Sequence, residues 1–105
     1  MSTNHDKIIA LDIDGTVCTI EADYSQCKLM EGCLEGILKF KEAGYLIYLH
    51  TGRHINHFET TTRWLKEHKV PYDHIVFGKP VAKYYIDDRG IRFSSWEQLF
   101  KDIEL

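Results

Sequence analysis

Four short apolar runs divide the chain, and each one ends in, or is soon followed by, a polar or charged residue. The runs are KIIAL (7–11), YLIYL (45–49), IVF (75–77) and YYI (84–86). Apolar runs of this length, bounded by turn-forming residues, are typical of buried β-strands. The pattern therefore predicts four strands, and a fifth short strand at the sheet edge can be added at 91–93.

Between these runs, apolar residues recur at helical spacing. The spacing predicts one helix over 30–43, followed by a glycine that stops it, and a second over 54–68. Ser94 and Glu97 form a capping-box pattern that predicts a final helix through Phe100. Pro80 can begin a single helical turn, because the missing N–H costs nothing at a first helical position.

Strands that alternate with helices predict an α/β fold with right-handed crossovers. We expect a Rossmann-like three-layer domain around a parallel sheet of four to five strands. With 105 residues, the chain is expected to form a single domain over 1–105. The intervals 16–33 and 52–78 hold only a short flap and one helix with one strand. Neither interval is long enough for a further domain, so a site at the ends of the strands should be open.

Two aspartates, Asp12 and Asp14, follow the first apolar run directly and precede Gly15. Residues two apart on a strand point to the same side. Like charges gathered in this way repel each other unless a cation or a shared proton compensates. This pair therefore predicts a metal site or an acid–base pair.

The other three runs also end near residues of catalytic type. Thr51 follows the second run, Lys79 the third, and Asp87 with Asp88 the fourth. In open α/β sheets, ligands bind outside the carboxyl ends of the strands. We therefore expect these side chains to converge with the two aspartates of the first run.

The ordered motifs DIDGT, HTGR, GKP and IDDR resemble the four motifs of the haloacid dehalogenase-like superfamily, and the resemblance extends from Lys7 to about Trp96. Most members of that superfamily are magnesium-dependent phosphohydrolases. The chain is also similar, more loosely, to short phosphatase-like proteins associated with bacterial surface-sugar biosynthesis. The resemblance thus implies a capless magnesium-dependent phosphatase acting on a small phosphorylated substrate, such as a sugar or another metabolite.

The resemblance also implies roles for individual residues. Asp12 would be the nucleophile that forms an aspartyl-phosphate, and Asp14 the general acid and base. Magnesium would be held by Asp12, by the backbone carbonyl of Asp14 and by Asp87, with Asp88 holding a metal-bound water. The sequence does not decide which of Asp87 and Asp88 binds the ion directly.

Phosphate binding is implied for the second and third motifs. Thr51, the backbone of Gly52 and Lys79 would bind the phosphoryl oxygens. Arg53 could reach an anionic substrate or pair with an acidic residue. Two alternatives stay open: a catalytically silent binding or regulatory module, and a receiver-like phosphoacceptor domain. The order of the motifs argues against the receiver. In a receiver, the paired acids come near the start and the lone phosphoacceptor comes later, whereas here DxD comes first and DD last.

Composition narrows the partners and the location. A net charge of −3 and a pI near 6.0 argue against a nucleic acid as the binding partner. The first residues, MSTNHDK, lack the apolar core of a signal peptide, and no run approaches the roughly 20 residues of a membrane span. We expect a cytoplasmic protein with free thiols at Cys18, Cys27 and Cys33. Because an open pocket excludes little water, a homo-oligomer is also expected.

Overall fold

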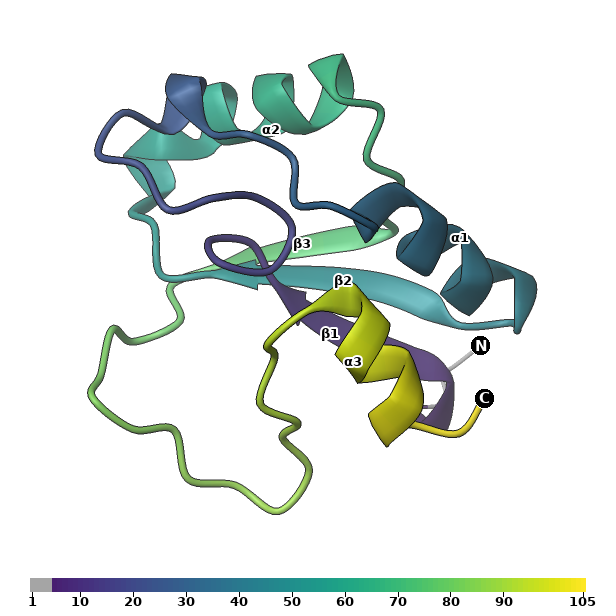
Figure 1. Ribbon diagram of the computed structural model, residues 1–105. Coiled ribbons are helices and arrows are strands. Elements are labelled where there is room, and N and C mark those ends of the chain that lie inside the picture. Colours follow the sequence, from purple (N-terminus) through teal and green to yellow (C-terminus); the bar gives the residue numbers. More distant parts are fainter. Residues whose placement is uncertain (1–4) are drawn as a thin grey trace.

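The structure, a computed structural model that describes residues 5–105, is an α/β fold with three parallel strands and three α-helices (Figure 1). The strands are β1 (Ile8–Asp12), β2 (Leu46–Thr51) and β3 (His74–Phe77). The helices are α1 (Cys33–Glu42), α2 (Phe58–Glu67) and α3 (Trp96–Asp102). Short 3-10 turns lie at His5–Lys7, Tyr24–Gln26 and Ile55–His57. The predicted polar start of the chain lies partly outside these residues, since 1–4 are not described.

Three of the predicted strands are confirmed, with ends shifted by one or two residues. The sheet order is β1-β2-β3, and the register aligns Asp12 with His50 and Thr51 with Phe77. Because both pairings are parallel, all three strands end at the same edge of the sheet. This edge is where the predicted site residues were expected.

The prediction of four to five strands is wrong for this structure, which has three within residues 5–105. The stretch 78–95 contains no helix or strand, so neither 84–86 nor 91–93 pairs, and Pro80 begins no helical turn. Backbone pairing needs a neighbouring strand as well as a suitable sequence. The apolar pattern of 84–86 alone could not supply one.

The final helix is also offset from its prediction by one residue at its start. Ser95, not Ser94, is the N-cap, and its hydroxyl accepts a hydrogen bond from the backbone N–H of Gln98 at 3.0 Å. Helix α3 packs against α1 rather than over the sheet centre. The ring of Phe100 lies 5.0 Å from that of Phe40, and Trp96 is buried beside Gly36.

One face of the sheet carries the core, and the other is left partly exposed. Ile47 and Leu49 are fully buried beneath α1 and α2, which lie on the same side of the sheet in Figure 1. On the opposite face, Ala10, His74 and Val76 are exposed. The two crossovers advance in the same direction across the sheet, so right-handedness puts both helices on one face. The predicted three-layer arrangement is therefore wrong for this structure.

Candidate active site at the carboxyl ends of the strands

A pocket of about 400 Å³ lies at the carboxyl ends of β1 and β2. Five of the predicted site residues line it: Asp12, Asp14, Gly52, Arg53 and Lys79. The remaining lining residues are Ile20, Glu21, Tyr24, Val81 and Tyr85. A larger hollow of about 640 Å³ lies over α2, away from all of the predicted motifs.

Asp12 stands at the end of β1, and its carboxylate is oriented from two sides. One oxygen, Oδ1, accepts a hydrogen bond from the backbone N–H of Ile13 at 2.9 Å. The other, Oδ2, lies 3.2 Å from the Nζ of Lys79. Lys79 also stacks over the ring of Tyr85, with Nζ 4.2 Å from its centroid. The pair holds a carboxylate beside a cation at the mouth of the pocket.

The turn after β1 brings the first motif back over its own strand. Gly15 has φ of 87°, a left-handed conformation that glycine adopts without steric cost. The backbone N–H groups of Val17 and Cys18 donate to the carbonyl of Ile13 at 2.9 and 3.1 Å. This tight turn is what keeps Asp14 beside Asp12 at the pocket.

Thr51 lies beneath the pocket and connects the second motif to the third. It is fully buried, and its hydroxyl accepts a hydrogen bond from the backbone N–H of Arg53 at 3.0 Å. Its carbonyl accepts from the backbone N–H groups of Gly78 and Lys79 at 3.1 and 3.0 Å. These bonds place the Lys79 loop at the end of β2.

Gly52 allows that loop to approach closely. A Cβ at this position would lie 3.0 Å from Cγ2 of Val81 and 3.1 Å from the carbonyl oxygen of Lys79. Only a residue without a side chain fits there unless the loop moves. The backbone of Gly52 consequently faces the pocket.

Arg53 is the most strongly held side chain of the site. Its Nε and Nη2 donate to the two carboxylate oxygens of Asp14 at 2.9 and 2.6 Å, and Nη1 donates to Thr61 at 3.0 Å. The guanidinium also lies 3.8 Å from the ring centroid of Tyr24. Burial acts to lower the pKa of Arg53, but the hydrogen bonds and charge of Asp14 outweigh it, and the pKa is raised. Contact between Arg53 and a substrate phosphate stays a prediction.

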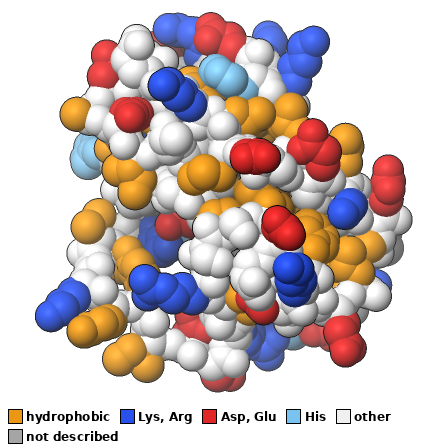
Figure 2. All heavy atoms as spheres, viewed as in Figure 1, with side chains coloured by type: hydrophobic (Ala, Val, Ile, Leu, Met, Phe, Trp, Pro, Cys, Tyr) orange, Lys and Arg blue, Asp and Glu red, His pale blue; other side chains and the backbone are white. Residues whose placement is uncertain are grey.

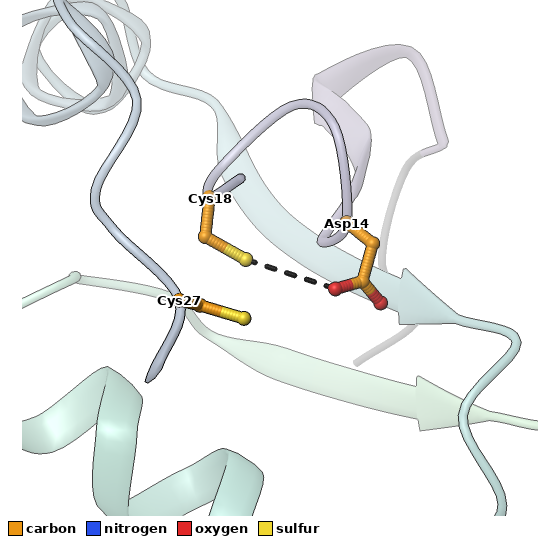
Figure 3. A group of neighbouring side chains, drawn as sticks. All are labelled: Asp14, Cys18 and Cys27. Atoms are coloured by element: carbon orange, nitrogen blue, oxygen red, sulfur yellow. Dashed lines mark hydrogen bonds between the residues drawn. The ribbon is translucent and has the colours of Figure 1, made fainter. Parts of the chain in front are cut away.

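Two buried cysteines lie next to the Asp14 carboxylate (Figure 3). Their sulfur atoms and a carboxylate oxygen are all within 4.8 Å of one another. The Sγ of Cys18 is 3.8 Å from Asp14, and Nη2 of Arg53 is 3.5 Å from the Sγ of Cys27. Burial, more than any other cause, raises the pKa of Cys18 far above its ordinary value. A protonated thiol beside a guanidinium is a poor cation ligand, so we assign no metal here.

The structure shows all three cysteines as free thiols, as predicted. Each one is buried in the core, which suits a small apolar side chain with a weak S–H donor.

The fourth motif lies outside the pocket. Asp87 and Asp88 are exposed, and neither lines the cavity. Asp87 instead accepts hydrogen bonds from the backbone N–H groups of Arg89 and Gly90, which closes a turn within its own loop. Within residues 5–105, the cysteine cluster around Asp14 is the only group of three or more potential ligands that close together. The predicted convergence of all four motifs is thus seen for three of them.

The sequence interpretation missed two residues that face these groups. His50 is the register partner of Asp12, and its Nδ1 is buried without a hydrogen-bond partner among the described residues. Burial and the charge of Lys79 lower its pKa, against the opposite effect of Asp12. The period of two along a strand, read across the first two runs, could have placed His50 there. Tyr85, whose hydroxyl donates to the carbonyl of Pro80 at 2.6 Å, had no such signal.

Comparison with known proteins gives a partial match. No protein-family model matches the chain. A curated protein of Oceanobacillus iheyensis, named "putative nucleotidase", is 32% identical over 82 residues, which is 66% of this chain and 44% of that protein. The match therefore spans less than half of the relative's length.

Two solved structures share the fold. A crystal structure of a Vibrio cholerae protein superimposes with a TM-score of 0.71 and 28% identity, covering 91% of this chain and 98% of the other. A chain from the structure of a Pnkp1/Rnl/Hen1 complex gives a TM-score of 0.63 and 22% identity, covering 97% of this chain and 36% of the other. The second likeness concerns the fold alone.

The helices found in residues 5–105 are all too short or too polar to cross a membrane.

Proposed function

We propose that the protein is a magnesium-dependent phosphohydrolase of the haloacid dehalogenase-like superfamily, and that it cleaves small phosphate monoesters through an aspartyl-phosphate on Asp12. One observation carries the proposal. Asp12 lies at the carboxyl end of the first strand, 3.2 Å from the ammonium of Lys79, in a pocket that also holds Asp14 and Gly52. The nucleotidase-like relative supports the same class of reaction.

In the first half-reaction, a carboxylate oxygen of Asp12 attacks phosphorus, and the P–O bond to the leaving group breaks. Lys79 already lies beside that carboxylate, so it can also neutralise an oxygen of the incoming phosphoryl group. The backbone N–H of Ile13 fixes the other oxygen of Asp12. The attacking group is therefore oriented before the substrate arrives.

The leaving oxygen needs a proton, and Asp14 is the residue proposed to supply it. In the structure both oxygens of Asp14 accept hydrogen bonds from Arg53, so the carboxylate has no proton to give in this arrangement. Proton donation requires Asp14 to turn from Arg53 toward the substrate. In the second half-reaction, Asp14 takes a proton from the attacking water, and the P–O bond to Asp12 breaks to release inorganic phosphate.

The ligands proposed for magnesium are only partly assembled in one chain. Oxygen ligands suit this ion, and both Asp12 and Asp14 line the pocket. Asp87 and Asp88 lie outside it. The residues of a single chain, as arranged here, do not complete the predicted ligand set.

A phosphate-release assay tests the proposed function. Purified protein is incubated with magnesium and a panel of sugar phosphates, nucleoside monophosphates and nitrophenyl phosphate. We expect release of inorganic phosphate by the wild type and none by Asp12→Asn, whose amide cannot attack phosphorus. Glu31→Gln, an exposed change before α1, serves as the matched control and should keep full activity.

Activity of Asp12→Asn close to that of the control would remove Asp12 as the nucleophile. Binding of a phosphate analogue by the wild type, without turnover of any substrate in the panel, would instead favour the alternative of a silent binding module.

A further inference from the structure

Two parts of the structure lack a packing partner. The outer edge of β1 has no neighbouring strand among the described residues, and the segment 84–88 exposes its apolar side chains. No strand in residues 5–105 pairs with β1 on the side away from β2. Tyr84 and Ile86 expose 71% and 95% of their surface, and Figure 2 shows hydrophobic side chains along this protruding loop at the lower left. An unpaired strand edge readily accepts another strand, and apolar side chains this exposed are typical of an unmade contact.

Within one chain, the connection is too short to bring that segment to β1 as a parallel strand. Lys79 is tied by its backbone to the end of β2, and Tyr84 comes only five positions after it in the chain. Five extended residues span at most about 18 Å. To bring Asp87 level with Asp12, Tyr84 must lie about 10 Å back along the strand and about 10 Å across the sheet from β2.

That displacement is about 14 Å in a straight line, but the line passes through β1 itself. The chain would have to leave the sheet plane, cross one face and return, a path of more than 20 Å by the same spacings. Parallel strands within a chain are usually joined by a dozen or more residues for this reason. The crossovers from β1 to β2 and from β2 to β3 are longer than a dozen residues, whereas the connection at 79–84 is much shorter.

We propose that a second copy of this chain supplies residues 84–88 as a strand parallel to β1, and that its Asp87 completes the site around Asp12. The part of this proposal that concerns the site rests on the proposed function. The exchange removes the length restriction, because the connection then runs between two molecules. Exchange of an identical segment between copies is a common route to a symmetric dimer.

The alternation of side chains fits this register. With Asp87 opposite Asp12, Ile86 lies opposite Leu11 and Tyr85 opposite Ala10. Residues opposite each other in register point to the same face, so Ile86 would join Leu11 on the face that α1 and α2 cover. Asp87 would project on the same side as Asp12. Tyr84, opposite Ile9, would point to the same face as Ile86. The exchange that brings Asp87 to the site would thus also bury the two most exposed apolar residues of the segment.

Disulfide trapping tests the exchange without any activity measurement. The register puts position 10 of one copy opposite position 85 of the other, so one preparation carries Ala10→Cys and another carries Tyr85→Cys. The two are unfolded together in urea, refolded and mildly oxidised. The native cysteines are buried, which leaves the introduced pair as the accessible thiols.

From the single variants, we expect a dimer-sized band on a non-reducing gel only when the two preparations are mixed. The double variant, with both cysteines in one chain, should also give dimers. If the double variant forms only an internal bond that runs as a monomer, or if light scattering shows the wild type to be a monomer at assay concentration, the exchange is wrong.

A mixing experiment then asks whether the exchanged Asp87 serves the site. Asp12→Asn and Asp87→Asn are each expected to be inactive alone. After co-refolding in equal amounts, half of the dimers are mixed and each mixed dimer has one intact site, so activity should recover to about one quarter of wild type. No recovery above the sum of the two variants would place Asp87 in the same chain as its Asp12, or outside the site.

The two readouts separate the failures. Disulfide-linked dimers from a protein that releases no phosphate would retain the exchange and overturn the proposed function. Active monomers without cross-links would retain the proposed function and overturn the exchange.

Discussion

Replacement of Arg53 by methionine should destabilise the protein strongly, because it leaves a carboxylate without its cation. Arg53 is 4% exposed, and its guanidinium makes two hydrogen bonds to Asp14 and one to Thr61. Breaking a buried ion pair by removal of one partner costs roughly 3–5 kcal/mol. The side chain of Asp14 is 25% exposed, so water can partly replace the lost donors.

We therefore expect a loss near the lower limit, about 3 kcal/mol in the free energy of unfolding. For a domain of this size, the loss corresponds to a fall of roughly 12–24 °C in the melting temperature. Arg53→Lys should recover part of the loss, since an ammonium keeps the charge but cannot bind both oxygens in the same geometry.

Urea denaturation followed by tryptophan fluorescence measures this loss, because Trp64 and Trp96 are both buried. Arg63→Met, an exposed change on α2, is the matched control and should shift stability by less than about 0.5 kcal/mol. A double-mutant cycle with Asp14→Asn should give a coupling energy of about 2 kcal/mol. If Arg53→Met and the control were equally stable, the ion pair would have no part in holding the site together.

Three further outcomes are expected. Gly36→Ala should lower the free energy of unfolding by about 1–3 kcal/mol in the same urea titration, because its Cβ would lie 2.3 Å from the ring of Trp96; an unchanged midpoint would contradict the packing of α3 on α1. The pKa of Asp73 is held below its ordinary value, chiefly by a hydrogen bond from the backbone N–H of Ile47, so its stabilisation is present above the unfolded pKa and lost as pH falls through the folded one. Wild-type stability should then decline more steeply between pH 5 and about 2 than that of Asp73→Asn, and parallel curves would refute this. Chelation should stop phosphate release, and magnesium, not zinc, should restore it; full turnover in excess chelator would exclude the metal from the reaction.

Much of the site follows from local sequence. A parallel α/β sheet aligns the carboxyl ends of its strands, so the positions of Asp12, Thr51 and Lys79 after apolar runs were enough to predict that they meet. The helices α1 and α2 were predictable for a similar reason, because helical period is a local property of residue spacing. The free thiols were predictable from the odd number of cysteines and the absence of CxxC spacing.

Other features depended on three-dimensional packing. The pairing of Arg53 with Asp14 joins residues 39 apart in sequence, and both pairing and substrate binding were compatible with the pattern. The apolar run at 84–86 predicted a strand, yet a strand also needs an open edge within reach, and the reach is set by the path of the chain after β3. The sequence by itself determined which residues can do chemistry and at which ends of the strands they lie. Only the tertiary structure decided which of them meet, because that depends on chain length, crossover direction and sheet order, and these are not local properties.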